Sequence, residues 1–173
     1  MVPRMRWVER KFALDLPLGW YANVLARVRG TPARLEELTL AVPPEVLTRR
    51  DGERWSMQEH AGHLLDLEPL GAGRLDDFEA RLEHLRAADM SNRRTYEADH
   101  NAAPLDRILA DFRRERAEFV RRLESYDEEL AARTALHPRL QTPMRVIDLA
   151  YIVAEHDDHH LASIAELARL FAS

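Results

Sequence analysis

The sequence has 173 residues, of which 46% are hydrophobic and 32% are charged, the ordinary balance of a soluble globular protein. Its 25 Lys and Arg residues against 30 Asp and Glu residues give a net charge of −5, which argues against a nucleic-acid-binding domain because such domains are basic. The absence of cysteine excludes disulfides, thiolate metal ligands and a cysteine nucleophile.

The chain shows no signal for a membrane or for export. No apolar run reaches the roughly 18 residues that a membrane span requires. Residues 1–7 lack the apolar core of a signal peptide. We therefore expect a cytoplasmic protein with no membrane partner. Residues 1–15 are interpreted as an N-terminal arm and residues 16–173 as one domain.

The first part of the domain is predicted to form two short helices. The composition favours helices throughout, since only 6 Gly occur and no stretch alternates between apolar and polar residues. The first helix is predicted over residues 17–29. Thr31 is predicted to cap a second helix that has Pro32 at its first position and ends near Pro43. A single helical turn is expected over residues 45–47.

A long helix is predicted to begin at Ser56. Ser56 and Glu59 fit a capping box, in which each side chain bonds the backbone amide of the other residue. The helix is expected to continue to about Arg86. A kink is expected at Pro69, because proline removes one backbone hydrogen bond and crowds the preceding turn.

Two further long helices are predicted after the polar segment 88–103. The first carries an apolar stripe made of Leu105, Ile108, Leu109, Phe112, Phe119, Val120 and Leu123. His137 and Pro138 are expected in the following connection, and Thr142 with Pro143 is expected to open the last helix. The predicted fold is all-α: an antiparallel four-helix bundle with short extra helices and a kinked second long helix.

The histidines carry the functional information. Five of the 8 histidines fall into two tight groups, each on a predicted long helix. On the last helix, with 100° per residue and Val153 as zero, His160 lies about 20° and His156 about 60° from the centre of the apolar stripe. Asp157 also points inward, at about 40°, whereas His159 points outward at about 120°.

Two inward histidines four residues apart are suited to binding one cation together. The alternative is a pair of hydrogen-bonded core histidines. We favour a metal site, because a second histidine group stands on another helix. In that group the helical wheel places His60 near the centre of the apolar stripe and His63 toward its edge, but it does not choose between them because the kink at Pro69 disturbs the phase.

Four segments of the sequence resemble the DinB/YfiT-like superfamily. Residues 55–64, WSMQEHAGHL, resemble its W-[ST]-x-x-[EQ]-x-x-x-H-L segment, and residues 154–162, AEHDDHHLA, resemble its C-terminal H-x-x-H-H segment. Residues 30–35, GTPARL, and the isolated His137 with Pro138 resemble the YfiT-type branch. Glu59 departs from that branch, which tends to have Gln at this position.

The resemblance implies a four-helix bundle and a metal triad of one histidine from the first motif and two from the last. Carried over by position, the ligands are His63, His156 and His160. His60 and His159 would then be neighbours. The resemblance also implies either a metal-dependent hydrolase or a thiol S-transferase that uses a low-molecular-weight thiol, and it suggests a homodimer.

A three-histidine site leaves at least one metal position open, which favours catalysis or exchangeable binding over a closed structural site. Imidazole ligands do not choose among Zn, Ni and Fe. Four side chains are candidates to orient a ligand or line the pocket: Glu59, Asp66, Asp157 and His137. No catalytic residue can be assigned, and the substrate is expected to be a small molecule.

Two other functions are weighed against this enzyme. Five arginines on the third long helix, Arg113, Arg114, Arg116, Arg121 and Arg122, alternate with acids and are interpreted as a solvated, ion-paired face, so no nucleic-acid partner is expected. A non-catalytic metal-binding or stress-related interaction protein on the same scaffold is the main alternative. Trp20, Trp55 and Tyr151 could line a pocket, although core packing is the simpler interpretation of each.

Overall fold

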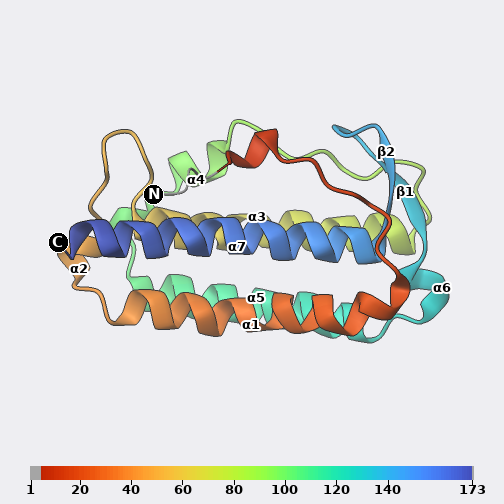
Figure 1. Cartoon of the computed structure of the whole chain (residues 1–173), viewed down its shortest axis with the longest axis horizontal. Helices are drawn as coiled ribbons and strands as arrows, with labels where there is room; N and C mark the ends of the chain where they lie inside the picture. The colour runs from red at the N-terminus through yellow and green to blue at the C-terminus, as the bar shows by residue number, and fades with distance from the viewer. Residues whose placement is uncertain (1–4, 173) are drawn as a thin grey trace.

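Four long helices form the body of the molecule (Figure 1). The structure is a computed structural model that describes residues 5–172, so residues 1–4 of the predicted arm and residue 173 of the predicted domain lie outside it. The long helices are α1 (Tyr21–Leu40), α3 (Met57–Glu79), α5 (Leu105–Glu124) and α7 (Val146–Phe171). The predicted four-helix bundle is confirmed, and no helix of the described residues is long and apolar enough to cross a membrane.

Shorter elements connect these helices. They are α2 (Pro44–Leu47), α4 (Arg93–Glu97), α6 (Glu128–Ala131), the strands β1 (Thr134–His137) and β2 (Thr142–Arg145), and the 3-10 turns η1 (Trp7–Glu9), η2 (Leu18–Trp20) and η3 (His100–Ala102). The helical turn predicted over residues 45–47 is therefore present as α2.

The bundle consists of two parallel pairs of helices. Helix α1 packs against α7 and α5, and α3 packs against α5 and α7. As Figure 1 shows, α1 and α7 run in one direction, and α3 and α5 run in the other. The predicted antiparallel arrangement is therefore present between the two pairs, with α1 and α7 antiparallel to α3 and α5. The long connection over residues 80–104 returns along the bundle and allows α3 and α5 to lie parallel.

Helix α1 is continuous, so the break predicted before Thr31 is wrong. Pro32 lies inside the helix and lacks the N–H that would bond the carbonyl of Val28. That carbonyl instead accepts a hydrogen bond of 3.2 Å from Nη1 of Arg116 on α5. An arginine from a neighbouring helix therefore satisfies the group that proline leaves open, and the helix continues.

Helix α3 begins as predicted and ends earlier than predicted. Ser56 is its N-cap, and the capping box with Glu59 is present. The helix continues through Pro69 and ends at Glu79, seven residues before the predicted Arg86. Arg81 adopts a left-handed conformation with φ of 56°, and the N–H of Leu82 bonds the carbonyl of Asp77 at 2.9 Å. This bond closes the helix in a Schellman-type end.

A small hairpin replaces the predicted start of the last helix. Strands β1 and β2 are antiparallel, with Thr134 opposite Arg145 and His137 opposite Thr142. Strand β1 is bridged on its other side by His84, whereas β2 is an edge strand, so the missing N–H of Pro143 in β2 is tolerated. Helix α7 begins at Val146 because Asp148 accepts hydrogen bonds from the backbone and the guanidinium of Arg145.

The core is divided into two apolar clusters with polar side chains between them. One cluster lies toward the hairpin and includes Leu75, Phe78 and Leu149, and the other lies toward the opposite end and includes Leu35, Leu64 and Ile164. Each long helix contributes one residue to a buried polar layer, made of Thr31, Glu68, Arg116 and Asp157. The histidines of α3 and α7 lie beside this layer.

The described part of the N-terminal arm lies along the bundle. Its Leu14 and Leu16 pack against the apolar cluster near the hairpin. Trp7 in η1 packs edge-on against the imidazole of His156, with ring centroids 4.9 Å apart. The arm thus reaches the histidines from outside the four long helices.

Candidate metal centre

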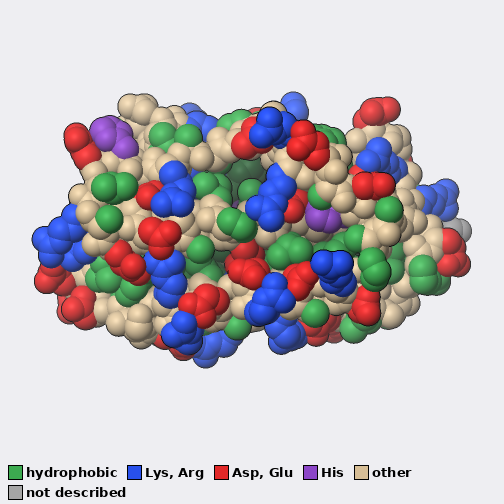
Figure 2. Space-filling view, turned by 180° about the vertical axis from the view of Figure 1, so that it is seen from behind, with side chains coloured by type: hydrophobic (Ala, Val, Ile, Leu, Met, Phe, Trp, Pro, Cys, Tyr) green, Lys and Arg blue, Asp and Glu red, His purple; other side chains and the backbone are tan. Residues whose placement is uncertain are grey.

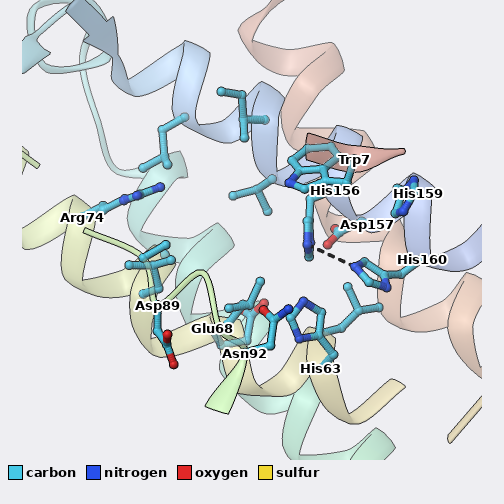
Figure 3. A pocket seen from close by; sticks show the side chains of 18 of the residues that line it. Trp7, His63, Glu68, Arg74, Asp89, Asn92, His156, Asp157, His159 and His160 are labelled. Atoms are coloured by element: carbon cyan, nitrogen blue, oxygen red, sulfur yellow. Dashed lines mark hydrogen bonds between the residues drawn. The ribbon is translucent and has the colours of Figure 1, made fainter. Parts of the chain in front are cut away.

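Three histidines from two helices meet at one point in the bundle (Figure 3). His63 comes from α3, and His156 and His160 come from consecutive turns of α7. One ring nitrogen from each lies within 4.8 Å of the other two, and Nε2 of His156 is 3.1 Å from Nε2 of His160. These are the three histidines that the family resemblance selects.

Two of these imidazoles are held in place through their other nitrogen. Nδ1 of His63 is 2.9 Å from the hydroxyl of Thr95 on α4. Nδ1 of His160 is 2.8 Å from Nδ1 of His60. Each contact leaves Nε2 of the ring for another partner, which is how protein groups commonly orient a histidine that binds a metal.

The environment keeps the histidines neutral. Burial, followed by the nearby His156, lowers the pKa of His63 to about 3. Burial also lowers the pKa of His156 to about 3 and that of His160 well below its usual range. At pH 7 the three rings therefore carry unprotonated nitrogens, the form that binds a metal.

The donor set fits a divalent ion. Two imidazole nitrogens on a tetrahedral zinc ion lie about 3.3 Å apart, given Zn–N bonds of about 2.0–2.1 Å. The 3.1 Å between His156 and His160 agrees with this spacing. His63 completes a face of three nitrogens and leaves further positions for water or another ligand.

A cavity of about 470 Å³ opens beside the histidines. Trp7 and Trp55 lie at this end, and the Trp55 ring centroid is 4.7 Å from that of His63. Of the other two aromatic candidates, Trp20 is 57% exposed, and Tyr151 packs on Phe12 and does not line the cavity. The volume is that of a site for a small organic molecule.

Asp66 acts on the histidine cluster through Thr95. Its carboxylate lies 2.7 Å from Nε2 of His100 and 3.2 Å from Nε of Arg94. Burial alone would raise its pKa, but hydrogen bonds from His100 and Thr95 hold the pKa of Asp66 below its usual value. Thr95 therefore bonds both Asp66 and His63, and links the carboxylate to the histidine.

The other predicted carboxylates are engaged elsewhere. Glu59 accepts from the backbone N–H of Ser56 at 2.8 Å and from Arg50, and it does not line the cavity. Asp157 lines the cavity, but its carboxylate accepts from Thr31 at 2.6 Å and from Arg116. The structure thus brings neither one to a histidine ligand by a direct hydrogen bond.

The remaining histidines of the sequence motifs are neighbours of the cluster. His60 contacts His160, as described above, and His159 contacts Arg10 at 3.4 Å and packs on Trp7. His137 lines the cavity from the end of β1, where its Nδ1 accepts from the N–H of Leu140 at 3.2 Å.

The interpretation of Arg116 as a solvated residue is wrong. Arg116 is 2% exposed and donates to both Glu68, at 2.6 Å, and Asp157. The sequence contained the signal, because Arg116 follows Phe112 by one helical turn and therefore lies on the same apolar stripe. Its long stem packs with the core while its charge is paired inside the bundle.

The other arginines of α5 are paired with acids near the surface. Arg113 bonds Glu36 of α1 at 2.7 Å, Arg114 bonds Asp111, Arg121 bonds Glu118, and Arg122 bonds Glu79 of α3. Figure 2 shows Lys and Arg side chains interspersed with Asp and Glu, and hydrophobic side chains inside a hollow. The face shown carries no extended basic patch.

Two contributors to the site had no usable sequence signal. Trp7 reaches His156 from the arm, and Thr95 reaches His63 from the connection between α3 and α5. Neither lies in a periodic segment or in a motif. Only the folded chain shows that these residues lie beside the histidines.

Comparison with known proteins identifies the family. The model of the DinB superfamily matches residues 27–164. The fold is similar to that of YfiT from Bacillus subtilis, described as a probable metal-dependent hydrolase with an unusual four-helix bundle topology, with a TM-score of 0.82, 20% identity, and coverage of 95% of this chain and 94% of that one. No curated protein matches the sequence. The chain belongs to the DinB superfamily.

Proposed function

We propose that this member of the DinB superfamily is a divalent-metal-dependent hydrolase in which His63, His156 and His160 hold the metal. The observation that carries the proposal is the meeting of three neutral imidazoles at the end of a cavity of about 470 Å³. The similarity to YfiT, described as a probable metal-dependent hydrolase, supports the same activity. Zinc, nickel and iron are all compatible with three imidazole ligands.

The metal would supply Lewis acidity, which lowers the pKa of a bound water or polarises a substrate carbonyl. The residues of this chain hold and orient its ligands. Thr95 fixes the ring of His63, and His60 fixes the ring of His160. Trp7 and Trp55 cover the histidines with aromatic rings, which reduces the access of bulk water to the centre.

A thiol S-transferase is the second candidate function. One observation favours it: the chain has no cysteine, so a sulfur nucleophile would have to come from a small thiol in the cavity. A coordinated thiol loses its proton at neutral pH, which would make it a nucleophile. A non-catalytic metal-binding protein would use the same histidines without turnover.

The first experiment is metal analysis of the purified, untagged protein. We expect about one divalent ion per chain, and its loss in His63→Ala and His156→Ala. His84→Ala is the matched control, because His84 is exposed and lies outside the cluster. Wild-type protein that takes up no zinc, nickel or iron would contradict the proposal.

A second experiment separates the candidate functions. Metal-loaded protein is assayed for hydrolysis of neutral and anionic esters and amides, and for consumption of a small thiol with an electrophile. Thiol-independent hydrolysis that is lost in His160→Ala supports the hydrolase. Turnover that requires the thiol supports the transferase, and bound metal with neither activity supports the non-catalytic protein.

A small-molecule substrate, a homodimer and a cytoplasmic location are further parts of this proposal.

A further inference from the structure

The cavity has a second polar end, formed by Arg74. Arg74 lies on α3 about three helical turns beyond His63. Figure 3 shows the side chain of Arg74 extending from α3 into the cavity, at the end opposite the histidines. Apolar side chains line the walls between the two ends, namely Leu67, Leu70, Phe119, Leu149, Ile152 and Val153. Glu68, Arg116 and Asp157 also line the cavity, and their charges are paired with one another.

Arg74 is buried, and none of the carboxylates in the described residues lies within ion-pair distance of it, although Asp77 is near enough to act on its charge. Its side chain is 6% exposed, and Nε donates one hydrogen bond of 3.2 Å to the carbonyl of Arg86. Within residues 5–172 it forms no ion pair. Arg116, by contrast, is paired with both Glu68 and Asp157. A buried cation without a counter-ion destabilises the fold, so stability does not account for Arg74.

Two cations, Arg74 and Arg139, and one acid, Asp89, line this end of the cavity, and the carboxylate of Asp89 accepts hydrogen bonds from the backbone N–H groups of Ser91 and Arg93. The nearby acid, Asp77, is already bound by the backbone N–H and the guanidinium of Arg86 at 2.7–3.1 Å. Burial lowers the pKa of Arg74 most, the negative charge of Asp77 raises it, and the positive charges of Arg139 and Arg86 lower it; the resulting pKa of about 10 still leaves Arg74 charged at pH 7. His137 lines the same end, and burial followed by Arg74 and Arg139 lowers its pKa to about 4, so it is neutral there.

We propose that the cavity binds an apolar monocarboxylate whose carboxylate pairs with Arg74 and whose other end reaches the histidine cluster. The two Nη atoms of a guanidinium match the two oxygens of a carboxylate. The apolar walls favour a hydrocarbon body and disfavour a second charge along its length. The inference depends on the proposed metal-dependent function only for the reaction at the histidine end.

Binding of a matched pair of probes tests the carboxylate site. Octanoate and octanol are titrated into the metal-loaded protein, and the tryptophan fluorescence of Trp7 and Trp55 reports binding. We expect octanoate to bind more tightly than octanol. Arg74→Met should weaken octanoate binding by about tenfold or more and leave octanol binding unchanged, because only the charge-assisted pair is lost. The octanoate affinity of Arg74→Lys should lie between that of the wild type and that of Arg74→Met.

A control variant and a further probe make the result specific to Arg74. Arg81→Met removes a charge from the C-terminal end of α3 at a residue whose side chain is 72% exposed, and it should leave octanoate binding unchanged. Equal octanoate binding by the wild type and Arg74→Met would overturn the inference. Tighter binding of octyl phosphate than of octanoate would overturn the carboxylate class.

The metal-free protein separates this inference from the proposed function. In His156→Ala, octanoate binding should persist and should still depend on Arg74. If octanoate binding is lost together with the metal and is unchanged in Arg74→Met, the carboxylate binds the metal, and the inference is overturned. Absence of metal from the wild type would overturn the proposed function alone.

Thermal unfolding gives an independent measurement. If Arg74 is kept for a ligand, Arg74→Met should melt at the same temperature as the wild type or higher, since methionine retains an apolar stem and removes a buried charge. A melting temperature several degrees lower would assign Arg74 to the stability of the fold and contradict the inference. Added octanoate should raise the melting temperature of the wild type more than that of Arg74→Met.

Discussion

Two groups of buried polar residues lie side by side in the middle of the bundle, and they differ in how completely they are paired. In the polar layer of Thr31, Glu68, Arg116 and Asp157, the arginine donates to two carboxylates and to a backbone carbonyl. In the histidine cluster, three neutral rings direct nitrogens at one another, and the cavity beside them ends at Arg74. The layer whose opposite charges are paired stabilises the fold, whereas a cluster of neutral imidazoles and a buried guanidinium without an ion pair are the features on which the two proposals of ligand binding depend.

The largest expected effect is on the paired layer. Arg116→Ala leaves the carboxylates of Glu68 and Asp157 buried without a cation, and we expect it to lower the free energy of unfolding by about 3–5 kcal/mol. Urea denaturation followed by circular dichroism measures the change. Arg114→Ala, at a side chain that is 65% exposed, should change it by less than about 0.5 kcal/mol. Similar changes in the free energy of unfolding for the two variants would show that the polar layer does not stabilise the fold.

A smaller effect is expected where the fold supports the histidine cluster. Thr95→Val removes the hydroxyl that contacts Nδ1 of His63 and keeps a side chain of similar shape. We expect the affinity for zinc to fall about tenfold, which is the usual effect of removing a group that orients a ligand. Competition with a chromogenic chelator measures the affinity, and Thr134→Val, at an exposed residue of β1, is the matched control. Unchanged affinity would mean that His63 does not need this contact to bind.

The smallest effect is expected at Pro32. Proline inside a helix usually destabilises it by about 3 kcal/mol relative to alanine. Here Arg116 already satisfies the carbonyl of Val28, so Pro32→Ala should raise the free energy of unfolding by less than about 1 kcal/mol. The same urea titration measures it, and a gain near the full value would show that Arg116 does not compensate for the proline.

Periodicity was sufficient for the parts of the fold that bury one face. The apolar stripe of α5 and the capping box of α3 each predicted a helix from local residues, and both are present. The break at Thr31 and the helix start at Thr142 were wrong because proline was interpreted locally. The cost of Pro32 in α1 is offset by Arg116 of α5, and the cost of Pro143 is small because β2 is an edge strand of the hairpin.

The site could be predicted only in part. The spacing of His156 and His160 places both rings on one face of α7, which periodicity can show. The choice of His63 over His60 came from the family resemblance, and the structure brings His63 into the cluster and leaves His60 against His160. Trp7, Thr95 and Arg74 depend on tertiary packing and on a cavity, and neither is encoded in a local pattern.

The pairing of His63 on α3 with His156 and His160 on α7 has a mechanical consequence. An ion shared by these residues would fasten two antiparallel helices whose ligands stand about 90 residues apart in the chain, as a disulfide does in proteins that contain cysteine. This chain has no cysteine with which to build such a cross-link. A metal bound for its chemistry would therefore also act as a reversible cross-link between α3 and α7. Its loss would weaken the packing of these two helices, which form walls of the cavity.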